Sequence, residues 1–224
     1  MQSVLRPLVA PLAVAVLLGT PVPAAAHGAP PRPAAGPKFE HRTLTVTRAA
    51  LGAAYRTGCP VPPAELRLLR MSHWGFDGKV HTGSMVVHER VVKDVLYVFW
   101  KAFGAKFPIR KMRPLSAYGG SDVKAMADDN TSAFNCRQVT GNPDALSQHS
   151  FGDAIDINPL ENPYVDRTGR VHPAAAARYL DRSRHVKGMI HSNSVITEAF
   201  RRIGWEWGGR WYHPDYQHFS RNGR

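Results

Sequence analysis

A carboxylate placed inside an apolar strand constrains this chain more than any other feature. Residues 147–159 read SQHSFGDAIDINP, and Asp156 stands between Ile155 and Ile157. Burying a carboxylate costs free energy unless another group pairs with it. A salt bridge, a hydrogen-bond network or a metal ion must therefore accompany Asp156 in the folded protein.

The same segment predicts a bend followed by a short strand. Gly152 allows a tight turn after His149, and the strand then carries Ile155 and Ile157 on one face and Asp156 on the other. An imidazole and a carboxylate are common ligands of divalent metals, and catalytic zinc usually takes three protein ligands. A third ligand is therefore expected elsewhere, with a hydrogen-bonded His–Asp pair as the metal-free alternative.

The aromatic C-terminal region supplies a candidate for that third ligand. In the segment DYQHF, a strand would turn Phe219 inward and His218 to the polar face. Asp215 precedes His218 by three residues and is the predicted general base, because a carboxylate there can take a proton from an attacking water. Glu206 is the alternative base and His213 the alternative ligand. Together these residues predict metal-assisted hydrolysis of an amide.

Apolar patterning over the rest of the chain predicts a mixed fold. Residues 66–88 read as two extended stretches separated by an Asp-Gly turn, and residues 131–139 return to a strand-like pattern. Apolar residues recur at three- and four-residue spacing within 89–107 and again after Ser194, which predicts two amphipathic helices. Strands and helices do not alternate, so the expected class is α+β with a mainly antiparallel sheet and flanking helices.

The N-terminal region predicts export. Residues 1–26 combine a positive charge at Arg6, an apolar run and a closing series of alanines, which is typical of a secretory signal peptide. The apolar run is too short to cross a bilayer comfortably, although an uncleaved membrane anchor is the alternative. Residues 27–38 are rich in proline and alanine and read as a flexible leader. The folded domain is therefore expected over residues 39–224.

The cysteine count agrees with an oxidising compartment. The chain has two cysteines, Cys59 and Cys136. In an exported protein such a pair predicts a disulfide, and buried reduced thiols are the alternative. Neither cysteine has a partner at C-x-x-C spacing, so a cysteine-based zinc site is not expected.

A net charge of +12 predicts attraction to polyanions. Cell-wall polymers, anionic lipid headgroups and DNA all fit this charge. The chain lacks the basic stripe with interleaved aromatic residues that nucleic-acid binders use, so no nucleic-acid partner is expected. No segment after the N-terminal region is apolar for long enough to span a membrane, and a monomer outside the cell, associated with the wall, is expected.

The segment SQHSFGDAID matches a known ten-residue pattern. It resembles the S-x-H-x-x-G-x-A-x-D signature of the zinc D-Ala-D-Ala carboxypeptidase and L-Ala-D-Glu endopeptidase family, which shares a fold with the Hedgehog signalling domain. GWEWGGRW and DYQHF resemble the family's C-terminal element, and NTSAFNCR resembles the strand that carries its active-site arginine. The similarity extends over roughly residues 66–220 and implies a Hedgehog/DD-peptidase-like fold.

The resemblance also implies a role for each site residue. The family's three zinc ligands and its general base correspond to His149, Asp156, His218 and Asp215. Arg137 takes the place of the family's arginine, a fixed cation near the oxyanion, with a salt-bridging surface arginine as the alternative. Ser147 matches the first signature position, where its hydroxyl either contacts substrate or fixes the loop.

Motif and resemblance together predict an exported zinc (Zn²⁺) peptidase. Its expected substrates are amide bonds in peptidoglycan stem peptides, cleaved in either a carboxypeptidase or an endopeptidase mode. The alternative is a zinc-containing cell-wall-binding domain of the same fold that has lost hydrolysis. Because the predicted base Asp215 is present, catalysis is favoured over binding alone.

Overall fold

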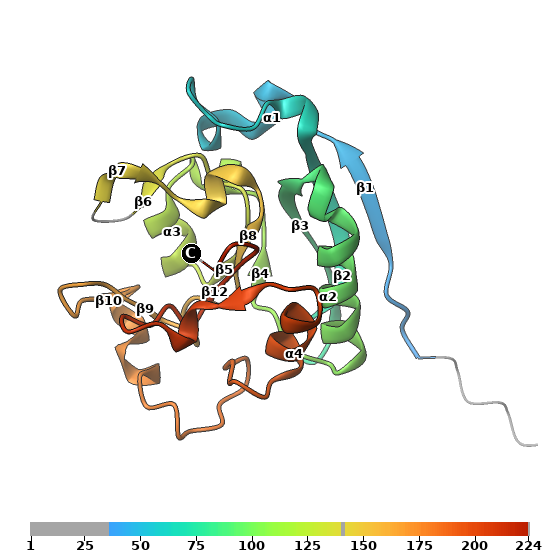
Figure 1. The fold of residues 1–224 in the computed structure, drawn as a ribbon. Helices are drawn as coiled ribbons and strands as arrows, with labels where there is room; N and C mark the ends of the chain where they lie inside the picture. Colours follow the sequence, from blue (N-terminus) through green and yellow to red (C-terminus); the bar gives the residue numbers. More distant parts are fainter. Residues whose placement is uncertain (1–35, 140–141, 224) are drawn as a thin grey trace, which may run out of the picture. The chain divides into compact units, whose positions relative to one another are not determined.

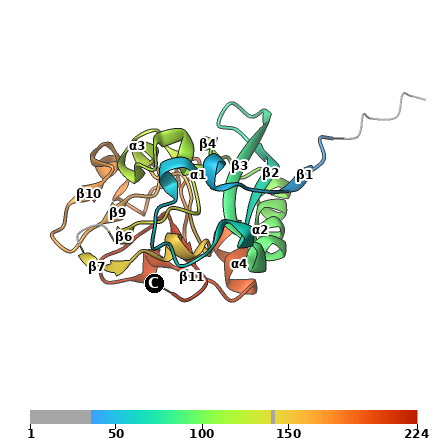
Figure 2. The ribbon, with the colours of Figure 1, turned by 90° about the horizontal axis from the view of Figure 1, so that it is seen from above.

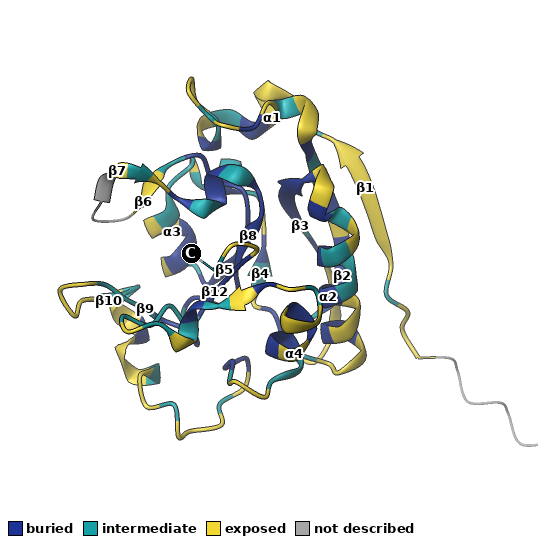
Figure 3. Cartoon of the chain, in the orientation of Figure 1, coloured by how far each residue is buried: buried dark blue, intermediate teal, exposed yellow. Residues whose placement is uncertain are grey.

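A long antiparallel hairpin organises the first half of the domain. β2 (Leu66–Trp74) and β3 (Val80–His88) pair along their whole length, and β1 (His41–Thr45) adds to the free edge of β2. This arrangement confirms the two predicted extended stretches and the turn between them. β1 is exposed along its length, whereas the second half of β3 is buried (Figure 3).

The computed structural model describes residues 36–139 and 142–223. Residues Pro37–Arg224 form one compact unit. The expected signal peptide (1–26) and most of the expected leader (27–38) lie outside the described residues, so both stay predictions. Within the described ranges, no helix is both long enough and apolar enough to cross a membrane.

Two amphipathic helices continue the hairpin layer. α2 (Val92–Gly104) packs against β2, and α4 (Val195–Arg202) packs against α2 (Figures 1 and 2). The 3.6-residue period of apolar side chains predicted both helices, because that period places them on one face. The buried face of α2 consists of Val95, Val98, Phe99, Ala102 and Phe103.

The second half of the domain is built from much shorter elements. A central three-stranded antiparallel sheet has the order β11 (Glu206–Trp207), β12 (His218–Ser220) and β8 (Ala154–Asp156). In its register His218 lies opposite Asp156, and Phe219 lies opposite Ile155. The predicted strands around residues 156 and 218 are therefore confirmed.

The remaining elements are short. The two-stranded pairs are β4 (Lys111–Met112) with β5 (Asn130–Thr131), which is parallel, and two antiparallel pairs, β6 (Gln138–Val139) with β7 (Asn142–Leu146) and β9 (Tyr164–Val165) with β10 (Val171–His172). Two short α-helices are α1 (Arg48–Leu51) and α3 (Asp122–Ala127). The 3-10 turns are η1 (Gly52–Ala54), η2 (Pro63–Glu65), η3 (Glu89–Val91), η4 (Leu115–Tyr118), η5 (Gln148–Phe151), η6 (Ala174–Tyr179) and η7 (Gly208–Arg210).

The fold is thus a mixed α and β structure with several small, mainly antiparallel sheets, where one sheet was expected. The expected strand over residues 131–139 also differs, since only its ends pair as β5 and β6. Its middle is buried, and its backbone donors bond separate segments: Phe134 N to Val86 O, Asn135 N to His149 O and Cys136 N to Ala54 O. Because successive residues of this segment donate hydrogen bonds to three different neighbours, the segment cannot pair continuously with one strand.

One apolar core joins the hairpin half to the central sheet. It includes Leu69, Met85, Val95, Phe99, Ile155, Phe200 and Phe219, none of which is more than 1% exposed. The ring of Phe219 stacks on that of Phe200, with 4.1 Å between centroids. The strand that carries His218 is therefore anchored directly in the core.

A disulfide fastens the segment that leads to the predicted site arginine. Cys59 and Cys136 are bonded across a sequence separation of 77 residues, which confirms the predicted pair. Cys136 is buried in a second apolar cluster that includes Leu51, Val61 and Phe134. The covalent bond thus fixes the residue immediately before Arg137 to the N-terminal part of the domain.

Candidate active site

All six residues predicted for the site line one pocket. The pocket has a volume of about 120 Å³ and is lined by residues that include Arg137, Ser147, His149, Asp156, Asp215 and His218. They come from widely separated parts of the chain. The pairing of β8 with β12 places Asp156 opposite His218. The structure therefore assembles the residues that the sequence motifs selected.

The turn after His149 depends on a glycine. His149 lies in η5, and Gly152 ends that turn with φ +69°, the left-handed region that favours glycine. A Cβ atom at Gly152 would stand 2.7 Å from the backbone nitrogen of His88, so a side chain has no room there. The predicted bend is confirmed, and it directs the chain from His149 into β8.

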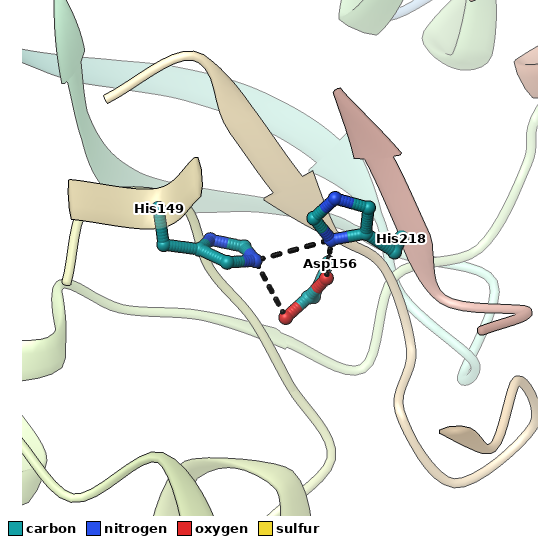
Figure 4. A group of neighbouring side chains, drawn as sticks. All are labelled: His149, Asp156 and His218. Carbon is teal, nitrogen blue, oxygen red and sulfur yellow. Dashed lines mark hydrogen bonds and ion pairs between the residues drawn. The ribbon is translucent and has the colours of Figure 1, made fainter. Parts of the chain in front are cut away.

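Two imidazoles and one carboxylate converge on one point (Figure 4). His149 Nε2 lies 3.1 Å from Asp156 Oδ2, and His218 Nδ1 lies 3.0 Å from Asp156 Oδ1. The two ring nitrogens are 3.2 Å apart. All three side chains are buried, and one ligand atom from each lies within 4.8 Å of the others. Two imidazole nitrogens and a carboxylate are a donor set that zinc accepts.

A backbone carbonyl fixes the orientation of His149. Its Nδ1 lies 2.6 Å from Ala133 O, and because a carbonyl only accepts, Nδ1 carries the proton of this hydrogen bond. In the neutral ring the lone pair is then on Nε2, which faces Asp156 and His218. Metal-binding histidines are commonly oriented in this way, so the cluster fits a bound cation.

The charges in the cluster stabilise one another. Burial alone would lower the pKa of His149, but the charge of Asp156 and a hydrogen bond to it leave that pKa above its ordinary value. Burial also opposes ionisation of Asp156, yet the charges of His149 and His218 and hydrogen bonds to them hold its pKa well below the usual range. Asp156 is therefore an ionised carboxylate at neutral pH.

Asp215 enters the pocket from the segment before β12. Its backbone nitrogen donates to Gly208 O at 3.0 Å, and a Cβ atom at Gly208 would stand 2.7 Å from Asp215 O. Oδ1 of Asp215 is buried and has no hydrogen-bond partner among the described residues. Burial raises the pKa of Asp215 to about 7, with the charge of Asp156 acting in the same direction. A carboxylate with one unpaired oxygen, Oδ1, thus lines the same pocket as the His–Asp–His cluster.

Arg137 reaches the pocket as one half of an ion pair. Its Nη2 lies 2.7 Å from Asp122 Oδ2, and the two side chains are 21% and 14% exposed. Nη1 also donates to Gln138 O at 3.1 Å. No local sequence pattern links Asp122, in the first turn of α3, to residue 137, so a role for Asp122 was not predictable.

Ser147 has a structural contact and also faces the pocket. It is the N-cap of η5, where its Oγ accepts from His149 N at 3.4 Å. Its backbone nitrogen donates to Arg137 O at 2.9 Å. The hydroxyl therefore holds the loop of His149, and a contact with substrate stays a prediction.

The two alternatives from the sequence lie outside this cluster. Glu206 is exposed in β11 and does not line the pocket. His213 contacts the ring of Tyr212 and is not among the three clustered ligand residues. The geometry thus favours Asp215 over Glu206 and His218 over His213.

The pocket lining also includes Tyr164, Trp211 and Gln217, which were not predicted for the site. Tyr164 forms a backbone bridge with Asp215, and the Trp211 ring lies 5.4 Å from that of His218. Gln217 is 2% exposed, and its Oε1 has no hydrogen-bond partner among the described residues. Gln217 and Trp211 stand inside or next to the motifs already singled out, so proximity to the motif was the available signal. Tyr164 had no signal in the sequence.

Comparison with known proteins agrees with this geometry. The fold and the cluster define a candidate hydrolase site, and a family model described as D-alanyl-D-alanine carboxypeptidase matches residues 140–221, which hold the cluster and Asp215. Residues 140–221 are thus similar to this peptidase family, which supports the predicted resemblance. No curated protein and no solved structure matches the chain. The Hedgehog-like fold therefore stays a prediction.

Proposed function

We propose that this protein is an exported, zinc-dependent peptidase that hydrolyses amide bonds in peptidoglycan stem peptides. The observation that carries the proposal is the convergence of His149, Asp156 and His218 beside the Asp215 carboxylate in one pocket. The match of this region to a peptidase family supports the reaction class.

His149, Asp156 and His218 would hold the zinc ion. When bound, zinc supplies Lewis acidity that polarises a carbonyl and makes a water molecule more acidic. Asp156 contributes the negative charge of the site, and the bond from His149 to Ala133 O keeps the ring in the required tautomer.

Asp215 acts as the general base and then as the general acid. Its carboxylate accepts a proton from the water whose oxygen bonds to the scissile carbonyl carbon. As the carbon–nitrogen bond breaks, the same carboxyl group returns that proton to the leaving amine. Oδ1 of Asp215 is buried and makes no hydrogen bond to any other described group, so it is available to accept this proton.

Arg137 stabilises the charge that develops on the carbonyl oxygen. A fixed guanidinium in a partly buried site stabilises an oxyanion more effectively than a cation in bulk water. Its ion pair with Asp122 holds the guanidinium in place at the pocket. Ser147 orders the loop of His149 and offers a hydroxyl to the substrate.

Two properties support action outside the cell at the wall. A disulfide forms and persists in oxidising compartments, and the bond between Cys59 and Cys136 agrees with export. The net charge of +12 favours attraction to anionic wall polymers. We infer a secreted, wall-associated monomer.

The alternative is a zinc-containing wall-binding domain without hydrolysis. Such a domain would have no use for a carboxylate poised beside the ligands, so the position of Asp215 favours the enzyme. The secreted form should release peptide fragments from purified peptidoglycan, identified by mass spectrometry. Chelation should abolish this release and added zinc should restore it. Release that chelators leave untouched would contradict the mechanism.

Substitution of the base separates hydrolysis from metal binding. Asp215→Asn should keep zinc while lowering kcat by about 10²–10⁴-fold, because the attacking water loses its proton acceptor. Zinc content and peptide release measure the two effects on the same sample. Glu206→Gln is the matched control and should stay within about twofold of the wild type, as expected of an exposed residue outside the pocket. The opposite result would make Glu206 the base.

A further inference from the structure

The described lining of the pocket has few positively charged side chains with which to bind a substrate that carries a free carboxylate. Among the described residues that line it, there is one arginine, Arg137, and no lysine. Three aspartates line the same pocket: Asp122, Asp156 and Asp215. A substrate carboxylate that enters this pocket meets more fixed negative than positive side chains, apart from the charge of a bound metal.

Asp122 already engages that one arginine. The separation of 2.7 Å between Asp122 Oδ2 and Arg137 Nη2 is that of a charge-assisted hydrogen bond. Both side chains are less than a quarter exposed, so water screens the pair less than it screens a surface ion pair. A free carboxylate could bind Arg137 only in competition with Asp122 and against its repulsion.

The neutral side chains of the pocket also favour an amide over a free carboxylate. Gln217 is buried, its Nε2 contacts Met126 Sδ at 3.5 Å, and its Oε1 acceptor has no partner among the described residues. A carboxylate has only acceptor atoms, whereas an amide also offers N–H donors. Acceptors at Gln217 and Asp122 therefore complement an amide group and leave a carboxylate unmatched.

We propose that Asp122 is a specificity-determining residue. Through its ion pair with Arg137, it directs the site to amides whose leaving residue carries a blocked α-carboxyl group, either a simple amide or a further peptide bond. Leaving residues with a free α-carboxylate are disfavoured. The inference rests on the proposed function and names the substrate class within it.

Matched peptides test this inference with the zinc-loaded protein. One pair is an acetylated stem peptide that ends in D-Ala-D-Ala, as the free acid and as the C-terminal amide. The other pair contains L-Ala joined to the γ-linked D-Glu residue, with its α-carboxyl group free or amidated. In whichever pair is cleaved, kcat/KM should be roughly tenfold higher for the blocked member, since like charges in a binding site oppose association.

Variants of Asp122 show whether the ion pair sets this ratio. Asp122→Asn should bring the ratio of kcat/KM for the blocked member to kcat/KM for the free acid to about one, because Arg137 then lacks its competing carboxylate. Asp122→Glu, which keeps the charge, should preserve the preference. Asp94→Asn removes one charge from α2, outside the pocket lining, and should leave the ratio unchanged.

The outcomes separate the two proposals. Preference of the wild type for the free carboxylate overturns this inference and leaves the peptidase intact. An unchanged ratio in a folded Asp122→Asn protein also overturns it, since a merely structural role would not alter substrate selectivity. Cleavage of none of the four peptides overturns both the inference and the proposed function. The wild-type ratio decides the substrate class even where a variant fails to fold.

Discussion

The hairpin half and the site half of this domain are stabilised by different interactions. Strands β2 and β3 each span nine residues, and their buried apolar side chains share one core with those of α2. The central sheet of the site has strands of only two or three residues. Around it the chain is held by buried polar side chains, of which Asn158 and Asn162 are each 0% exposed.

Asn162 illustrates how the site half is held together. Its Nδ2 donates to three carbonyls, those of Ile157, Asn158 and Gly188, and its Oδ1 accepts from Ile190 N and from Arg182. This one side chain thus satisfies backbone groups that, in a regular sheet, would bond to a neighbouring strand. Apolar burial tolerates changes of shape, whereas a polar network requires each partner, so the two halves should respond differently to substitution.

The largest effect is expected where the two halves meet. Phe219→Ala removes a fully buried ring that stacks on Phe200, and should lower the free energy of unfolding by about 3–5 kcal/mol. Urea denaturation of the wild type and the variant under the same conditions measures the loss. A loss below about 1 kcal/mol would mean that the site strand is not anchored in the core.

A pair of similar-sized substitutions compares the two halves directly. Asn162→Leu keeps the approximate volume but removes every hydrogen bond of that side chain, and should cost about 2–4 kcal/mol. Met85→Leu is the matched change in the hairpin half, also at a fully buried position, and should cost less than about 1.5 kcal/mol. Equal losses in the two variants would remove the distinction between apolar and polar stabilisation.

The smallest effect concerns a buried acid in the site half. Glu161 is 2% exposed beside Asp129, and Arg110 lies 3.3 Å from its Oε1. Burial, reinforced by the charge of Asp129, raises the pKa of Glu161 from 4.5 to about 7. The folded state therefore binds this proton more tightly than the unfolded state does. The stabilisation is present below pH 4.5 and is lost as the pH rises through about 7.

Glu161→Gln should remove this dependence. Between pH 5 and pH 8, the free energy of unfolding of the wild type should fall by about 1–3 kcal/mol relative to the variant. Urea denaturation of both proteins at these pH values measures the difference, and other titrating groups cancel in the comparison. A constant difference across the range would show that Glu161 titrates normally in the folded state.

The same contrast explains how much the sequence could predict. Periodicity gave α2, α4 and the hairpin, because each has enough residues for an apolar pattern to repeat. The clustered residues His149, Asp156 and His218 could be selected as candidate ligands, because each stands in a short motif whose chemistry requires those residue types. The long elements, whose apolar pattern repeats, were therefore predictable, whereas the strand expected over residues 131–139 was not.

Features that depend on contacts distant in sequence had no such pattern. Asp122 meets Arg137 only because α3 packs beside the segment after the disulfide, and nothing in residues 115–130 indicates that contact. Asn162 stands in a polar stretch, residues 161–191, that shows no apolar pattern, yet it is fully buried. A polar residue that satisfies backbone groups from two other segments looks, in sequence, like any loop residue.

The direct pairing of His218 with Asp156 has a consequence for how this chain can vary. Because the two side chains are cross-strand neighbours, their spacing is set by the β8–β12 register, whatever the length of the chain between them. The β9–β10 hairpin turns at Thr168, an exposed tip within that intervening stretch. Lengthening the tip should cost little, since doubling a flexible loop adds only about 0.6 kcal/mol of closure entropy. An additional segment inserted at this tip should therefore leave the spacing of His218 and Asp156 unchanged.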